Sequence, residues 1–107
     1  MFGSVLLLGH LGVAQDTLRV QIHGTVLDSI SLAPLAEVMV EWFDENGRQQ
    51  AVSISNTDGR YAMFVRTTGS LDLRVEENGY RPFRTTVKDL RRGESARELD
   101  LRLRPLD

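Results

Sequence analysis

The sequence predicts an all-β fold, a seven-stranded antiparallel Greek-key β-sandwich. Short segments along most of the chain alternate apolar with polar residues, which is the period of a strand that buries one face. Turn pairs that favour tight reversals separate these segments, namely Asn46-Gly47, Asp58-Gly59 and Asn78-Gly79. No segment has a convincing helical period. Two sheets packed face to face bury half-apolar strands of this kind.

The first half of the chain supplies three strands. Segment 18–26 alternates apolar and polar residues, whereas segment 28–35 is expected to be a loop because its proline cannot donate to a ladder. Segment 38–42 alternates again and is the second strand. The hairpin signal at Asn46-Gly47 then predicts that segment 48–55 returns as the third strand.

The second half supplies four more strands. Segments 61–65, 71–75 and 80–87 each follow a turn signal, and segment 99–103 follows a polar connector over 89–96. The residues expected to face the core are Leu18, Val20, Ile22 and Val26; Val38, Val40 and Trp42; Val52 and Ile54; Tyr61, Met63 and Val65; Leu71, Leu73 and Val75; and Leu99, Leu101 and Leu103.

The N-terminus has the pattern of a signal peptide. An uncharged apolar stretch over 5–14 is too short to span a bilayer, and Gly12 and Ala14 are small residues at −3 and −1 of a cut after Ala14. No Lys or Arg precedes the stretch, so the alternatives are a start inside a longer signal or a first strand of the domain. We expect residues 1–14 to be the signal and 15–107 the domain, secreted or periplasmic or associated with the outer membrane, and not transmembrane after processing.

Composition excludes several classes of function. The net charge of −2 gives no electrostatic case for nucleic acid. The absence of cysteine removes disulfides, thiolate metal sites and cysteine nucleophiles. No cofactor is indicated.

Four motifs resemble the carboxypeptidase regulatory-like domain family, a group of transthyretin-like (prealbumin-like) sandwiches. They are Gly24-Thr25-Val26-Leu27-Asp28, Ala33-Pro34-Leu35 with the strand after it, Asn56-Thr57-Asp58-Gly59-Arg60-Tyr61, and Gly79-Tyr80. The resemblance covers roughly residues 18–103. It implies a seven-stranded accessory module on secreted or surface proteins.

Two polar residues invite a functional interpretation. Asp58 could belong to a calcium loop, but calcium takes six to eight oxygen ligands, and we expect Asp58 to accept hydrogen bonds within its own turn. His23 is the only histidine beyond the expected signal, and one histidine without cysteine makes no usual zinc site. We therefore predict a surface histidine and no metal or catalytic residue.

The aromatic residues are expected to be mostly structural. Tyr61 and Tyr80 follow turn glycines and should cover the ends of the sandwich, each with its hydroxyl on backbone or water. Trp42 should be core. Phe43 must face the opposite way and shares its face with Met39 and Glu41. This row of Met39, Glu41 and Phe43 is the predicted binding surface, unless a loop or Phe83 covers it.

These features favour a non-enzymatic exported module that binds an envelope protein or a carbohydrate, with edge-strand self-association as a further option. The resemblance also raises a hydroxyisourate hydrolase, but the histidines and the C-terminal Tyr-Arg-Gly-Ser of those enzymes are missing. A structural or adhesive sandwich with an isopeptide bond is disfavoured, since Lys88 is the only lysine and the last strand holds no asparagine. An exposed aromatic platform would indicate sugar binding, whereas a flat apolar strip beside an unpaired strand would indicate pairing with another chain.

Overall fold

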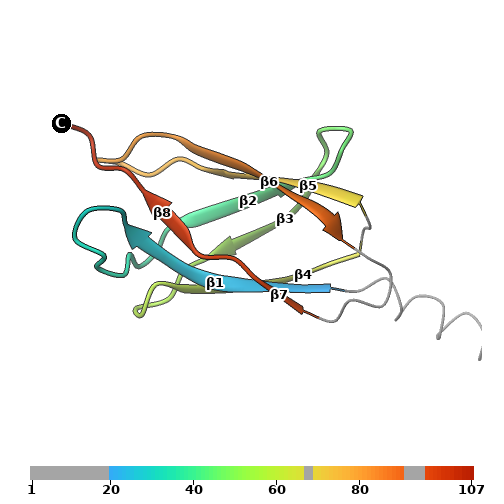
Figure 1. Ribbon diagram of the computed structural model, residues 1–107, viewed down its shortest axis with the longest axis horizontal. Coiled ribbons are helices and arrows are strands. Elements are labelled where there is room, and N and C mark those ends of the chain that lie inside the picture. Colours follow the sequence, from blue (N-terminus) through green and yellow to red (C-terminus); the bar gives the residue numbers. More distant parts are fainter. Residues whose placement is uncertain (1–19, 67–68, 91–95) are drawn as a thin grey trace, which may run out of the picture.

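The computed structural model describes residues 20–66, 69–90 and 96–107, and it confirms the predicted all-β sandwich (Figure 1). The described residues form eight strands, one more than expected: an additional short strand, Ala96–Glu98, precedes the C-terminal strand, which covers Leu101–Leu103 of the predicted 99–103. The strands are β1 (Val20–Asp28), β2 (Met39–Phe43), β3 (Gln49–Ile54), β4 (Arg60–Val65), β5 (Gly69–Val75), β6 (Phe83–Leu90), β7 (Ala96–Glu98) and β8 (Leu101–Leu103).

The strands pack as two sheets. One sheet has the order β4-β1-β7, with β8 also pairing with β1, and the other has the order β3-β2-β5-β6. Most pairs are antiparallel, as predicted, but β7 and β8 lie parallel to β1. The last two strands therefore lie beside the first described strand. No helix of the described residues is long and apolar enough to cross a membrane.

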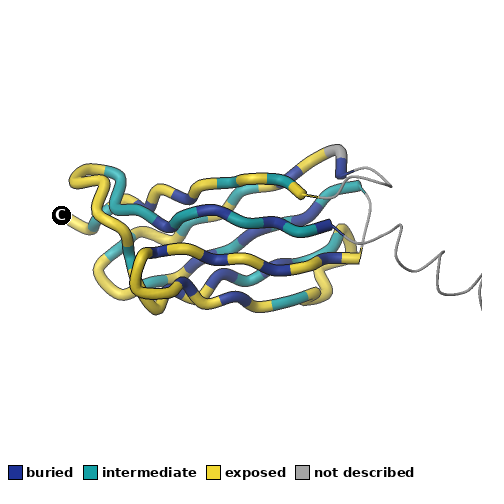
Figure 2. Tube along the Cα trace, turned by 90° about the horizontal axis from the view of Figure 1, so that it is seen from below, coloured by how far each residue is buried: buried dark blue, intermediate teal, exposed yellow. Residues whose placement is uncertain are grey.

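The core lies between the sheets, and buried residues alternate with intermediate or exposed ones along most strands (Figure 2). The inward faces predicted for β1, β2, β4, β5 and β8 are confirmed within the described residues, and Leu18 lies outside them. The fully buried side chains are Trp42, Ile22, Leu71, Leu73, Leu101, Leu103, Val20, Val26, Val38, Val40 and Val75.

The predicted face of β3 is wrong. Val52 and Ile54 point outward and are 44% and 59% exposed, whereas Ser53 and Ser55 are buried. The serines can face the core because backbone groups satisfy their hydroxyls: Ser53 Oγ donates to the carbonyl of Ala62 (3.1 Å). Ser55 Oγ donates to a loop carbonyl (2.7 Å) and accepts from the Val38 N–H (2.9 Å).

The same turn is built twice. Residues 44–48 and 56–60 read Asp-Glu-Asn-Gly-Arg and Asn-Thr-Asp-Gly-Arg. In each, a side-chain oxygen of the first residue accepts from the backbone N–H groups of the third and fifth residues at 2.9 Å. Asn56 therefore organises the second turn, and the expectation that Asp58 does so is wrong. Gly59 has the expected positive φ of 76°.

The C-terminal segment is kinked between β7 and β8, where it crosses Gly24. The N–H of Leu99 donates to the carbonyl of His23 (2.8 Å), and Asp100 Oδ1 accepts from the N–H of Thr25 (2.9 Å). A Cβ on Gly24 would lie 1.9 Å from the Leu99 carbonyl oxygen. That carbonyl also accepts a hydrogen bond from the Tyr61 hydroxyl. A kink in the C-terminal strand thus needs both the glycine and the tyrosine.

A second tyrosine ties the two sheets together at the end of β1. Tyr80, just before β6, donates its hydroxyl to Asp28 Oδ2 (2.9 Å). Asp28 Oδ1 accepts from the N–H groups of Ile30 and Ser31 at 2.8 and 2.9 Å. These backbone hydrogen bonds, Ser31 first, hold the pKa of Asp28 below its usual 3.8, and the hydrogen bond to Asp28 raises the pKa of Tyr80.

The Asp28 contacts predict an acid-dependent loss of stability. A carboxylate with a lowered folded pKa stabilises the protein above its unfolded pKa, and that contribution disappears as the pH falls through the folded value. We expect Asp28→Asn to melt at a lower temperature than wild type at neutral pH, with the gap closing below about pH 4. Thermal melts at a series of pH values measure this, and a gap that does not change with pH would contradict it.

Candidate functional site

The predicted binding row lies together on the outer face of β2. Met39, Glu41 and Phe43 alternate with the buried residues of that strand and point away from the core. Met39 is 48% exposed, whereas Glu41 and Phe43 are half-buried. The Glu41 carboxylate accepts a hydrogen bond from Gln49 Nε2 (2.9 Å) on β3. The three side chains share a face as predicted.

Phe43 is covered from the neighbouring strand. The guanidinium carbon of Arg74 on β5 lies 4.1 Å from the centroid of the Phe43 ring. Such stacking over an aromatic face is attractive and occupies that side of the ring. Phe83, the cover suggested by the sequence, instead packs against the core. Phe43 is therefore no open stacking platform.

The exposed part of this face is aliphatic. Met39 pairs in register with Ile54, and Glu41 with Val52, so the outward side chains of β3 lie beside those of β2. Met39, Val52 and Ile54, here called the apolar strip, are all among the exposed large hydrophobic residues. Sequence reasoning missed two of the three because it placed Val52 and Ile54 in the core.

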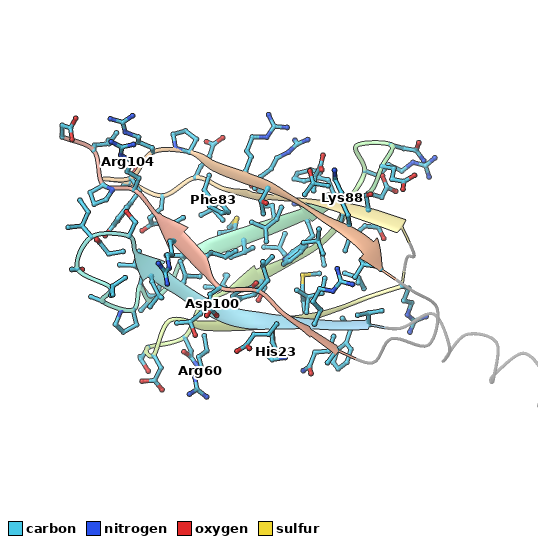
Figure 3. The ribbon with its side chains drawn as sticks, in the orientation of Figure 1. His23, Arg60, Phe83, Lys88, Asp100 and Arg104 are labelled. Carbon is cyan, nitrogen blue, oxygen red and sulfur yellow. The ribbon has the colours of Figure 1, made fainter. Side chains whose placement is uncertain are left out.

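A polar groove lies over the outer face of the other sheet and reaches the edge strand β3. It has a volume of about 690 Å³ and is lined by Gln21, His23, Gly24, Thr25, Ser53, Ile54, Asn56, Arg60, Tyr61, Ala62 and Glu98. His23 lies on the outer face of β1, with Ala62 of β4 and Glu98 of β7 as its cross-strand neighbours. Figure 3 shows His23 and Arg60 on the same side of the molecule. His23 is thus half-buried and lines the groove.

The other candidates do not gather into a site. Asp58 is exposed at its turn, and the described residues hold no group of three or more His, Asp or Glu side chains that could bind a metal. Tyr61 and Tyr80 bond Leu99 and Asp28, so both hydroxyls already have protein partners. The expected signal over 1–14 lies outside the described residues.

Two packed β-sheets with this strand order define a β-sandwich domain. The family model of the carboxypeptidase regulatory-like domain matches residues 21–104, which is most of the chain. The protein therefore belongs to the carboxypeptidase regulatory-like domain family. Comparison with the curated proteins finds no match.

Solved structures share the fold at low sequence identity. The TIE protein of Bacillus anthracis has a TM-score of 0.69 at 12% identity, over 83% of this chain and 18% of that chain. Chlorocatechol 1,2-dioxygenase from Pseudomonas putida has a TM-score of 0.66 at 11% identity, over 80% of this chain and 60% of that chain. A "putative carbohydrate binding protein" from Bacteroides uniformis has a TM-score of 0.61 at 20% identity, over 80% and 41%. The chain thus spans less than two thirds of these structures, and they show the fold alone.

Proposed function

We propose that this protein is a non-enzymatic binding module, exported to the bacterial envelope, that recognises another protein through the apolar strip. The observation that carries the proposal is that Met39, Val52 and Ile54 lie exposed side by side on one sheet face. Contiguous exposed apolar side chains on a soluble domain mark sites of protein interaction. Polar groups at the margin, such as the Glu41–Gln49 pair, would lie at the rim of such a contact.

A protein partner fits this face better than a glycan. Sugar rings stack on open aromatic faces, but Arg74 already covers Phe43, and the residues left exposed are aliphatic. The "putative carbohydrate binding protein" of similar fold supports the glycan alternative only at the level of the fold. A glycan would have to use the groove around His23.

The test is partner capture by the wild-type chain and by two matched variants. Met39→Lys places a charge in the apolar strip, and Phe64→Lys places the same charge at a similarly exposed apolar residue of β4 in the other sheet. We expect an envelope protein captured by wild type to lose at least about tenfold in affinity for Met39→Lys, which corresponds to about 1.4 kcal/mol, and to keep its affinity for Phe64→Lys. Mass spectrometry identifies the partner and calorimetry measures both affinities.

Two results would overturn the proposal. One is a captured ligand that is a polysaccharide and binds Met39→Lys as well as wild type. The other is turnover of a substrate by the purified chain that is lost on changing a single polar residue. Circular dichroism confirms that both lysine variants remain folded, as expected for substitutions at half-exposed positions.

A further inference from the structure

We propose that β3 pairs antiparallel with β3 of a second copy of the chain, so that two four-stranded sheets become one. This goes beyond the proposed function because it concerns the backbone edge of β3 and not the outer face of the sheet. The strand is the first in the order β3-β2-β5-β6, so one of its sides has no strand partner among the described residues.

Backbone direction identifies the free groups of this edge. The N–H of Ser55 donates to the carbonyl of Val38 toward β2 (3.0 Å). In an antiparallel strand, the backbone N–H and C=O groups of successive residues point to opposite sides. The backbone groups of Ser53 therefore also point toward β2, and those of Val52 and Ile54 point away from it. These two residues therefore carry the hydrogen-bonding groups that a further strand would use.

The sequence of β3 lacks the features that normally protect an edge. Natural edges are blocked by charged residues, proline or inward-pointing charges. Gln49–Ile54 contains neither a charged residue nor a proline. The opposite edge of the same sheet, β6, carries Arg84 and Lys88. In the other sheet, the edge strand β4 has the carbonyl of Ala62 already bonded by Ser53. The donor in that contact is the side chain of Ser53, so the contact between β3 and β4 uses none of the outward backbone groups of Val52 and Ile54.

A second copy satisfies the chemistry of this edge. In two-fold antiparallel pairing, a strand lies against a second copy of its own sequence, so a charged residue would lie near the same charge of the other copy. Because β3 has no charged residue, this repulsion does not arise. A register centred on Ser53 places Val52 opposite Ile54 of the second copy and uses the outward groups of both residues. Exposed apolar side chains then meet exposed apolar side chains. The two apolar strips become neighbours on one continuous face.

The oligomeric state of the full chain gives the first test. Sedimentation of wild type is expected to give twice the mass of one chain. Val52→Lys is expected to give the mass of one chain, because the two introduced lysines, one in each copy, would place like charges at the pairing edge. Thr86→Lys, on the opposite edge β6, should keep the doubled mass. A wild type that stays at the mass of one chain at all concentrations, or a Val52→Lys variant that keeps the doubled mass, would overturn the proposal.

Cross-linking tests the register, since the chain has no cysteine of its own. Opposed residues that share hydrogen bonds have Cα atoms about 5.5 Å apart, within disulfide reach. A mixture of Val52→Cys and Ile54→Cys chains should therefore cross-link at least about tenfold faster than either variant alone. Equal rates in the mixture and the single variants would overturn the proposed pairing. Met39 lies on β2, so failure of the partner test and failure of this test are independent.

Discussion

Replacing Gly24 with alanine is expected to lower the free energy of unfolding by about 3 kcal/mol or more. The new Cβ would lie 1.9 Å from the Leu99 carbonyl oxygen and 2.6 Å from its carbon, both backbone atoms that no side-chain rotation can move. Relief requires β7 and β8 to shift away from β1. That shift would break the hydrogen bonds at Leu99 and Asp100 that hold the kink.

Gly47→Ala is the matched control. Gly47 has a φ of 79°, and a Cβ there would meet nothing within 4 Å, so only the left-handed backbone strain remains, about 1 kcal/mol. Urea denaturation followed by the fluorescence of Trp42, the only tryptophan, measures both. Equal losses for the two variants would show that the close approach at Gly24 does not matter for stability.

Gly24 also shows where sequence reasoning stops. It belonged to the motif that indicated the family, yet nothing in the pattern gave it a role, because the need arises from a strand 75 residues away in the chain. The break between β7 and β8 escaped prediction for the same reason. The alternation of Leu99, Leu101 and Leu103 predicted one strand over 99–103. The crossing over Gly24 leaves Leu99 outside β8, and the additional strand β7 precedes it.

The prediction of which face of β3 is buried was wrong for a different physical reason. Side chains in 48–55 do alternate between the two faces of the strand, but alternation alone leaves open which set of side chains faces inward. Pairing with β2 decides it, because Ile54 lies opposite the outward Met39. Hydrophobicity favoured the wrong set, since the buried serines are stabilised by backbone partners that the sequence does not reveal.

The candidate site was therefore only partly predictable. Alternation was enough to place Met39, Glu41 and Phe43 on one outward face. The cover over Phe43 depends on Arg74 from β5, a cross-strand neighbour known only once the sheet order is known. The repeated turn was within reach of the sequence, because both copies start with Asp or Asn four residues before an arginine.

Tyr61 should show the second large effect. Its ring is buried, with a centroid 6.2 Å from that of Trp42, so Tyr61→Ala is expected to cost about 3–5 kcal/mol. Tyr61→Phe keeps the ring and removes the hydroxyl that bonds Leu99. The carbonyl then lacks this donor, and we expect a loss of about 1–3 kcal/mol near neutral pH.

The pH dependence of the free energy of unfolding separates the contribution of the Tyr61 hydroxyl from that of its ring. Burial, and next the charge of Asp100, raise the pKa of Tyr61 well above its usual 10.0. A phenol with a raised folded pKa stabilises the protein fully below its unfolded pKa, and this contribution is lost as the pH rises from there toward the folded pKa. Above pH 10, wild type should lose about 1.4 kcal/mol per pH unit more than Tyr61→Phe. The stability gap between the two should therefore close.

Tyr80→Phe is the control for this effect, since the Tyr80 hydroxyl bonds Asp28 at the C-terminal end of β1, away from Leu99. It should keep the alkaline slope that Tyr61 contributes. Denaturation curves at intervals from neutral pH to about pH 11 measure all three chains. If the gap between wild type and Tyr61→Phe stays constant across this range, Tyr61 ionises as freely in the folded protein as in the unfolded chain. The kink at Leu99 would then not depend on a neutral phenol.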